Sequence, residues 1–366
     1  MEQVHNLEEI LVSHYKKYPC MQLQDAVKLV YQNEFAGGHF IEDEGRSLEI
    51  LREELRRVNS HDTGGDANHR FQLFEDIGNG LCRLHLKGLK DYAVDVGTVN
   101  KFFVYTANSN AGSVRGFEEK LDVLRKCCKE GSLPFPPGEL EECLQSCKRH
   151  GYPPVSHSGK YRETYFPAYR VVSSMFRDYF EVFCSIDCLL KKKNSIIAAI
   201  DGNSGAGKSS LASLLEEIYD CNVFHMDHFF LPSRLRTRER LAETGGNVDY
   251  ARFKDEIIKG LLSGREFSYH MYDCASDTMD RSITVTPKRL NIAEGSYSMH
   301  PTLIQYYDLK VFLGIDKETQ SHRILERNGL AMHERFMSDW VPMEDRYFSE
   351  MDIPAKSDIV IYGPQA

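Results

Sequence analysis

The sequence has little of what marks membrane, secreted or metal-stapled proteins. Its longest apolar run covers only residues 196–200, far short of the roughly 20 residues that span a bilayer. The opening residues, MEQVHNLEEI, are acidic and lack the basic stretch and apolar run of a secretory signal peptide. The 10 cysteines include no CxxC pair, which favours buried reduced thiols over a zinc site or a disulfide framework. We therefore expect a cytoplasmic protein.

A strong excess of basic charge is also missing. The chain has 45 Lys and Arg against 54 Asp and Glu, a formal net charge of −9. Because nucleic-acid binding depends on Lys and Arg neutralising phosphates, an acidic chain is a poor candidate for it. We expect a small-molecule substrate, with neither nucleic acid nor a membrane as partner, and leave a homodimer open as an alternative.

The length of the chain and the pattern of its sequence indicate two domains. At 366 residues the chain is too long for one ordinary core. The lysine-rich segment LLKKKN at 189–194 separates a part with mostly helical patterns from a part in which strand and helix patterns alternate. We expect a mainly α-helical domain at 1–190, with role unknown, and a second domain at 194–366.

The first domain shows apolar residues at helical spacing over most of its length. Helices are expected at residues 7–18, 23–35, 47–58, 94–107, 116–128 and 138–149. An aromatic-rich stretch at 161–190 is also expected to be helical, with a break at Pro167.

The second domain alternates short apolar runs with helical stretches. The runs lie at residues 195–200, 222–225, 290–293, 309–313 and 358–361. This alternation predicts an α/β domain of three layers, with a parallel sheet covered by helices on both faces. Residues 268–272 and 282–285 could add an antiparallel ribbon.

The strongest motif lies between the first of these runs and a helical stretch. Residues 202–209, GNSGAGKS, fit the Walker A pattern G-x-x-x-x-G-K-[S/T]. Glycines let backbone amides turn toward phosphate oxygens, the helix start adds a positive dipole end, and the lysine adds a cation. We expect ATP to contact Gly202, Asn203, Ser204, Gly205, Ala206, Gly207, Lys208, Ser209 and Ser210.

This loop alone suits a GTPase, an ATPase or a kinase equally, and residues downstream distinguish them. Asp227, in HMDHFFLP, follows the second apolar run. A carboxylate at the carboxyl end of a parallel strand faces the crevice where ligands bind. Asp227 could therefore accept a proton from an attacking hydroxyl and lie near Mg²⁺.

Four segments in this order resemble the uridine kinase, pantothenate kinase and phosphoribulokinase group of P-loop kinases. They are the glycine-rich loop, MDHFFLP, GGNVDYARF at 245–253 and the run ending in AEGSY at 293–297, within about residues 195–362. The resemblance implies an ATP-dependent, Mg²⁺-assisted kinase that phosphorylates a hydroxyl of a small molecule such as a nucleoside, a sugar or a vitamin.

The resemblance also implies roles for single residues. Asp227 matches the catalytic Asp, Asp249 the Asp that holds substrate hydroxyls, and Glu294 an acidic residue near the metal. Ser209, Asp227 and Glu294 would supply oxygen ligands of the kind Mg²⁺ prefers. Lys208 and two arginines that share a helical face in the lid region, Arg323 and Arg327, would offset charge on the transferred phosphate.

The acceptor stays open. Tyr272 and Asp273 could line its pocket, but the base-reading pattern of uridine kinases is not reproduced around them. A different reading is a regulatory protein that binds ATP as a switch and passes the signal through the first domain.

The first domain contains polar clusters at 31–39, 78–85 and 157–170 that match no recognised family. They suit either a second pocket for a polar or anionic ligand, which would make the enzyme bifunctional, or ordinary loops and helix ends. Glycines in these clusters allow close approach of backbone to a ligand.

Overall fold

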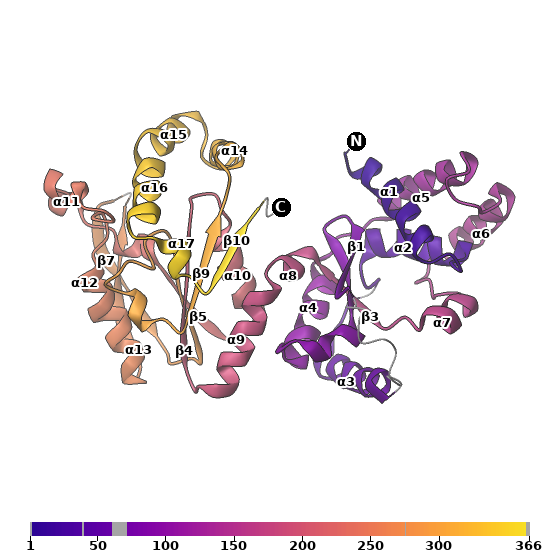
Figure 1. Cartoon of the computed structure of the whole chain (residues 1–366), viewed down its shortest axis with the longest axis horizontal. Coiled ribbons are helices and arrows are strands. Elements are labelled where there is room, and N and C mark those ends of the chain that lie inside the picture. The colour runs from indigo at the N-terminus through magenta and orange to yellow at the C-terminus, as the bar shows by residue number, and fades with distance from the viewer. Residues whose placement is uncertain (1, 39, 61–71, 275, 364–366) are drawn as a thin grey trace. The chain divides into compact units, whose positions relative to one another are not determined.

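The computed structural model describes residues 2–38, 40–60, 72–274 and 276–363, so position 39 of the first polar cluster lies outside the described residues. The chain divides into two compact units, Met1–Phe180 and Glu181–Ala366, each drawn in Figure 1. The first unit thus ends ahead of the lysine-rich segment at 189–194.

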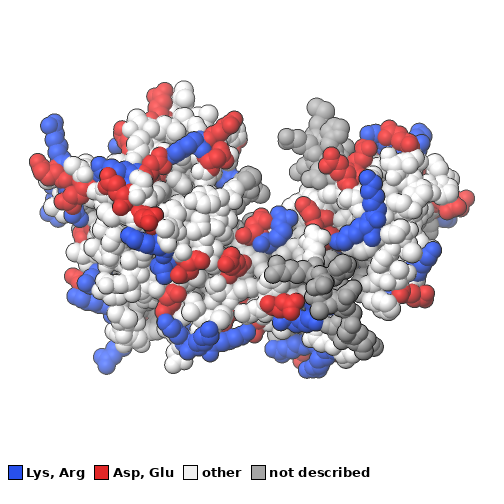
Figure 2. Space-filling view, viewed as in Figure 1, with Lys and Arg blue, Asp and Glu red and all other residues white. Residues whose placement is uncertain are grey.

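The described surface is charged and mixed. Acidic and basic side chains are interspersed over the face shown in Figure 2, rather than gathered by sign. Among the described helices, none combines the length and the apolar character needed to cross a bilayer.

The first unit is mostly helical in its described part, as predicted. Its helices are α1 (Glu2–Lys17), α2 (Leu23–Phe35), α3 (Glu44–Ser60), α4 (Val96–Ser109), α5 (Val114–Lys129), α6 (Pro137–Arg149), α7 (Gly159–Tyr165) and α8 (Ser174–Asp178), with a 3₁₀ turn η1 at Leu86–Asp91. Side chains cap several of them; Asp95 and Ser113, for example, accept the amides of Gly97 and Gly116 at the starts of α4 and α5.

A three-stranded antiparallel sheet in this unit was not predicted. It consists of β1 (Phe74–Gly78), β2 (Leu81–His85) and β3 (Tyr169–Ser173), in that order. The helix predicted over 161–190 is therefore wrong at β3. Helix α7 ends at Tyr165, Phe166 takes a left-handed φ of 46° ahead of Pro167, and the chain then pairs with β2 along its whole length.

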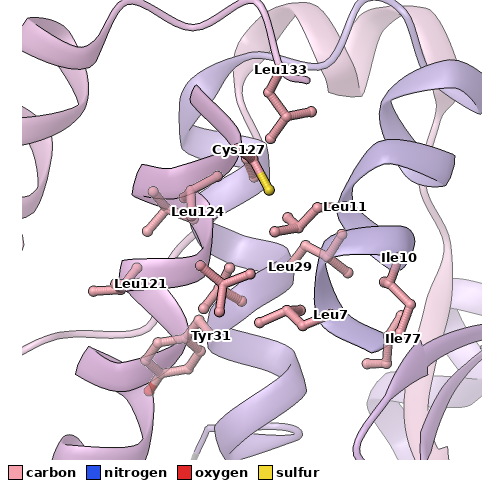
Figure 3. Packing of buried hydrophobic residues seen from close by; sticks show 14 of the residues in the cluster. Leu7, Ile10, Leu11, Leu29, Tyr31, Ile77, Leu121, Leu124, Cys127 and Leu133 are labelled. Atoms are coloured by element: carbon pink, nitrogen blue, oxygen red, sulfur yellow. The ribbon is translucent and has the colours of Figure 1, made fainter. Parts of the chain in front are cut away.

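The core of the first unit lies where α1, α2 and α5 meet β1. Figure 3 shows Leu7, Leu11 and Leu29 packed against Leu121 and Leu124. Burial of such side chains contributes about 1.5–3 kcal/mol each. The same three helices therefore fix β1 and, through it, the sheet.

The second unit contains the predicted parallel sheet. Its strands run in the order β10-β9-β4-β8-β5, every neighbouring pair parallel. Their bounds, all within a few residues of the predicted runs, are β4 (Ile196–Gly202), β5 (Cys221–His225), β8 (Leu290–Glu294), β9 (Leu309–Gly314) and β10 (Ile359–Tyr362). All residues of β4 are buried, as expected for a central parallel strand.

Helices cover both faces of this sheet, with α9 and α10 on one side in Figure 1 and α12 and α13 on the other. The helical elements are α9 (Phe180–Lys192), α10 (Lys208–Ile218), α11 (Arg238–Ala242), α12 (Tyr250–Phe253), α13 (Lys259–Ser263), α14 (Lys317–Asn328), α15 (Leu330–Arg335), α16 (Val341–Glu350) and α17 (Ile353–Lys356). The 3₁₀ turns are η2 (Met226–Phe229), η3 (Ser233–Leu235) and η5 (Ile304–Tyr306), and the π-helical segments are η4 (Lys254–Ile258) and η6 (Phe336–Trp340). One core cluster joins Ala199, Phe224 and Phe312 of the sheet to aromatics of α12 and α16.

The antiparallel ribbon is also present, as β6 (Phe267–Asp273) and β7 (Thr278–Val285). These strands pair with each other in a separate two-stranded sheet. The Tyr269 hydroxyl lies 3.3 Å from Nδ1 of His228, so the ribbon packs beside η2.

Candidate active site

The glycine-rich loop joins the central strand β4 to α10. Gly202, Gly205 and Gly207 have φ values of +146°, +81° and +95°, which glycine adopts without strain. A Cβ at Gly202 would lie 2.0 Å from the carbonyl oxygen of Leu313. Only glycine fits there, because β9 approaches so closely. The loop opens onto the amino-terminal end of α10, where free amides favour anions.

Lys208, at the start of α10, lies across this loop. Its side chain is buried, and its ammonium donates to the carbonyl oxygens of Gly202 and Asn203 at 2.9 and 3.0 Å. Among the described residues, no carboxylate lies within ion-pair distance of it. The charge is therefore available to a phosphate.

The remaining loop residues lie in or beside the cradle. The Ala206 amide donates to the Asn203 carbonyl at 3.1 Å, which closes the turn. Ser209 and Ser210 are exposed in the first turn of α10. The residues predicted to contact nucleotide thus lie together in the loop and the first turn of α10.

Glu294 ends β8 at the level where His225 ends β5. Its carboxylate accepts the Ser209 hydroxyl at 3.0 Å and pairs with His225 Nδ1 at 2.8 Å. Burial opposes its ionisation, but His225 and Lys208 outweigh burial and hold the pKa of Glu294 below its usual value. The hydrogen bond to Glu294 raises the pKa of His225. Glu294 is therefore an anion beside the loop.

Asp227 lies in η2, directly after β5. Its side chain reaches solvent, yet protein surrounds it on most sides, and this desolvation, followed by the charge of Glu294, raises the pKa of its carboxyl. Within the described part of the chain its carboxylate has no hydrogen-bond partner. Asp227 is thus a carboxylate with free lone pairs and increased affinity for a proton.

Glu344, from α16, fixes the loop from the side, and sequence reasoning missed it. Its carboxylate accepts the Ser204 amide at 2.9 Å, the Ser204 hydroxyl at 2.6 Å and the Ser296 hydroxyl at 2.8 Å. Gln320, fully buried, donates to the Ser204 carbonyl at 3.0 Å. No motif marks Glu344, because it lies 140 residues from Ser204 in sequence.

Asp201, the residue before the loop, was also missed. It is fully buried, and burial raises its carboxyl pKa to about 6. The carboxylate accepts the amides of Gly202, Tyr297 and Met299 and the hydroxyl of Tyr347, at 2.8–3.1 Å. A carboxylate that ends a buried strand could have indicated this role. Asp201 joins the loop to the segment after β8.

The two arginines predicted for the lid region, Arg323 and Arg327, have different surroundings. Arg323 Nη1 donates to the Gly205 carbonyl at 3.2 Å, so it touches the loop. Arg327 donates from Nε to Asn328 at 2.9 Å, and its guanidinium lies 5.9 Å from the centre of the Phe336 ring. The structure therefore brings Arg323, but not Arg327, to the phosphate cradle.

The three residues predicted to hold the acceptor lie near η2 on two elements. Asp249 begins α12 by accepting the Arg252 amide at 3.0 Å, and its own amide donates to the Phe229 carbonyl at 2.8 Å. Tyr272, buried in β6, donates to Asp277 at 2.7 Å. Asp273 is exposed at the end of β6 and accepts from Ser276. Asp249 thus has a capping role besides any contact with substrate.

This arrangement defines the class. A glycine-rich loop between a central parallel strand and a helix, with a lysine in the first turn, makes the second unit a P-loop α/β protein. Residues 196–335 match the model of the phosphoribulokinase / uridine kinase family. The match confirms the resemblance drawn from the motifs for this segment of the chain.

No curated protein matches the chain. Solved structures similar to it include a possible uridine kinase from Bacillus stearothermophilus, with 20% identity and a TM-score of 0.37 over 50% of this chain and 99% of that one. An uncharacterized protein from Eubacterium ventriosum shares 16% identity, with a TM-score of 0.28 over 46% and 88% of the two chains. The protein TT1252 from Thermus thermophilus shares 19%, with a TM-score of 0.28 over 48% and 91%.

Proposed function

We propose that residues 194–366 form an ATP-dependent phosphotransferase domain that acts on a hydroxyl of a small molecule, and that residues 1–190 form a separate domain. The observation that carries the proposal concerns Lys208 and Asp227 together. Among the described residues, Lys208 has no carboxylate within ion-pair distance and the Asp227 carboxylate has no hydrogen-bond partner. Lys208 follows β4 and Asp227 follows β5, and β8 lies between these two strands in the sheet. A regulatory protein that binds ATP as a switch would need Lys208 but not Asp227.

In this mechanism Asp227 accepts the proton of the acceptor hydroxyl. The oxygen then bonds to the γ-phosphorus of ATP, the bond from that phosphorus to the β–γ bridging oxygen breaks, and ADP leaves. The raised pKa of Asp227 suits a proton acceptor. Lys208 and Arg323 would stabilise charge on the transferred group, because each already contacts the loop.

The donor set beside the loop fits Mg²⁺. The Ser209 hydroxyl and the Glu294 carboxylate lie 3.0 Å apart, and the charge of Glu294 acts on Asp227. Oxygen ligands of this kind, with waters, are what Mg²⁺ takes. When bound, the ion would neutralise charge on the β- and γ-phosphates.

Candidate acceptors are nucleosides, sugars and vitamin-like alcohols. Asp249 would hold acceptor hydroxyls, since its backbone is tied to η2, which carries Asp227. Tyr272 and Asp273 would bound the pocket from the ribbon β6–β7.

The test is ADP release from the full-length protein with ATP, Mg²⁺ and a panel of nucleosides, sugars, vitamins and hydroxy amino acids. We expect one acceptor class to give a phosphorylated product, and Asp227→Asn to slow it by roughly 10²–10⁴-fold. Asp220→Asn is the matched control. Asp220 is exposed and directly precedes β5, whereas Asp227 follows the other end of that strand. ATP binding without turnover on every acceptor would contradict the proposal and favour the regulatory switch.

A further inference from the structure

The first unit contains a cavity of about 560 Å³ that the kinase chemistry does not use. It lies among α2, α3, α4, β3 and the segment before α7. Its volume is within the range of small-molecule pockets, about 300–1,000 Å³. Tyr31, Ile50 and Phe103 supply much of its apolar wall. The cavity therefore has room for a small organic molecule with an apolar body.

Another part of the cavity wall is polar, and hydrogen bonds hold it in one arrangement. His157 and Tyr169 line it, and His157 Nδ1 lies 2.8 Å from Asp25, a buried carboxylate that also accepts the Ser158 hydroxyl at 2.6 Å. Because the carboxylate only accepts, Nδ1 carries the hydrogen, and Nε2 accepts from the Tyr169 hydroxyl at 2.5 Å. Burial lowers the pKa of His157, which keeps the ring neutral.

Behind this wall lies a second layer of buried charge. Arg83 is 2% exposed and donates to Gln32 at 3.1 and 2.7 Å, and its guanidinium carbon lies 4.7 Å from the centre of the Tyr169 ring. Glu75 pairs with Arg83 at 3.3 Å. Burying such groups is costly unless they are paired and hydrogen-bonded. Here they are paired, and they hold Gln32 and Tyr169 against the cavity.

The charged groups that line the cavity itself favour an anion. They are Lys28, Arg46 and Arg170 against Asp43 and Glu54, an excess of one positive charge. Arg170 forms an ion pair with Glu54 at 2.7 Å. Lys28 donates to the Val155 carbonyl at 2.8 Å, but no carboxylate of the described residues lies within ion-pair distance of it.

The state of Lys28 supports the same conclusion. Its side chain is half-buried, and desolvation, followed by the charge of Arg83, lowers its pKa to about 8. A lysine held in this way gains more from an incoming anion than one in open water, because its charge is only partly solvated.

We propose that this cavity binds a small organic anion, with a carboxylate or phosphate at Lys28 and an apolar or aromatic body against Tyr31 and Phe103. The site is separate from the phosphate loop and does not depend on the kinase reaction. Its ligand would be a second substrate or an effector of the protein.

The experiment is saturation-transfer NMR on the full-length protein with three probes that share one ring: phenyl phosphate, benzoate and benzyl alcohol. A non-hydrolysable ATP analogue is added in excess, so that phenyl phosphate does not report on the phosphate loop. We expect one or both anions to bind more tightly than benzyl alcohol, and the tighter anion identifies the head group.

Lys28→Met should weaken binding of the anions about tenfold, the effect of losing roughly 1.4 kcal/mol, and leave benzyl alcohol unchanged. Lys16→Met, at an exposed position on α1, is the matched control and should change nothing. Ile50→Trp places a larger side chain in the cavity wall and should weaken the binding of all three probes. This variant provides the test if Lys28→Met fails to fold. Anion binding equal in wild type, Lys28→Met and Ile50→Trp, or no anion binding in the wild type, would overturn the proposal.

Discussion

Glu344 accepts both the backbone amide and the hydroxyl of Ser204, at 2.9 and 2.6 Å, and so holds the phosphate loop from α16. The carboxylate is buried. Its two hydrogen bonds fix the backbone and the side chain of the loop at Ser204. The loop therefore loses less conformational entropy when nucleotide binds.

Glu344→Ala should lower the affinity for an ATP analogue about tenfold or more, because hydrogen bonds to a charged group contribute about 1.5–3 kcal/mol each. Isothermal titration calorimetry would measure the change. Glu334→Ala, at an exposed position of α15, should bind as the wild type does. Equal affinities of all three proteins would show that the loop does not depend on α16.

Replacement of the two lid arginines should have unequal effects. Arg323→Ala should lower kcat by roughly 10²-fold, because a donor next to developing charge is lost. Arg327→Ala should change kcat only a few-fold, since its side chain contacts Asn328 and Phe336. Steady-state kinetics with a saturating acceptor would compare them. Equal losses in both variants would mean that the lid rearranges and brings Arg327 to the phosphates during the reaction.

Tyr347→Phe should destabilise the second unit by about 1.5–3 kcal/mol, since the buried Asp201 carboxylate loses a donor. The single tryptophan, Trp340, lies in this unit, so its fluorescence during urea unfolding reports the loss. In Tyr306→Phe the hydroxyl removed has no hydrogen bond among the described residues, and that variant should unfold near the wild-type midpoint. Coincident midpoints for all three proteins would show that Asp201 does not need Tyr347.

The first unit should lose stability in mild acid because of His157. Its folded pKa is lowered from 6.5, with burial as the main cause. The unfolded chain therefore takes up a proton as pH falls below about 6.5 while the folded chain does not, so stability declines from there until the folded pKa is passed. The lowered pKa of Asp25 adds a further loss at lower pH.

Urea titrations at pH 7 to pH 5 would measure this decline, followed by circular dichroism, with Trp340 fluorescence separating the second unit. His157→Gln should be less stable at pH 7 but should show a flatter pH dependence over about this range. The control is His150→Gln, at an exposed helix end. A decline of the same slope in His157→Gln would assign it to another group.

The central strands of the second unit, β4, β8 and β9, could be predicted because they are buried on both faces. Strand β4 is apolar or small at every position except Asp201, so a short dense run marks it without an alternating pattern. The glycine-rich loop is predictable for a related reason, since its chemistry depends on neighbours in sequence. Local signals therefore define the cradle and its sheet.

The sheet of the first unit could not be predicted in the same way. Strand β2, LCRLH, contains a buried arginine, and Arg83 is tolerated there only because Glu75 and Gln32 lie opposite it. Strand β3 reads as part of an aromatic helix until Phe166 and Pro167 end α7 and β2 offers a partner. Both depend on contacts between distant segments, as does the bond from Glu344 to Ser204, which no single-sequence pattern encodes.

Within the described part of the chain, β6 and β7 pair only with each other, and the ribbon that they form lies beside η2, the turn that carries Asp227. Substitutions at the exposed positions of its strands should therefore leave the five-stranded sheet and its phosphate loop as they are. Directed evolution toward a new alcohol should start with a library limited to this ribbon. Such a library would vary the residues beside the acceptor and leave the residues around the phosphate loop unchanged.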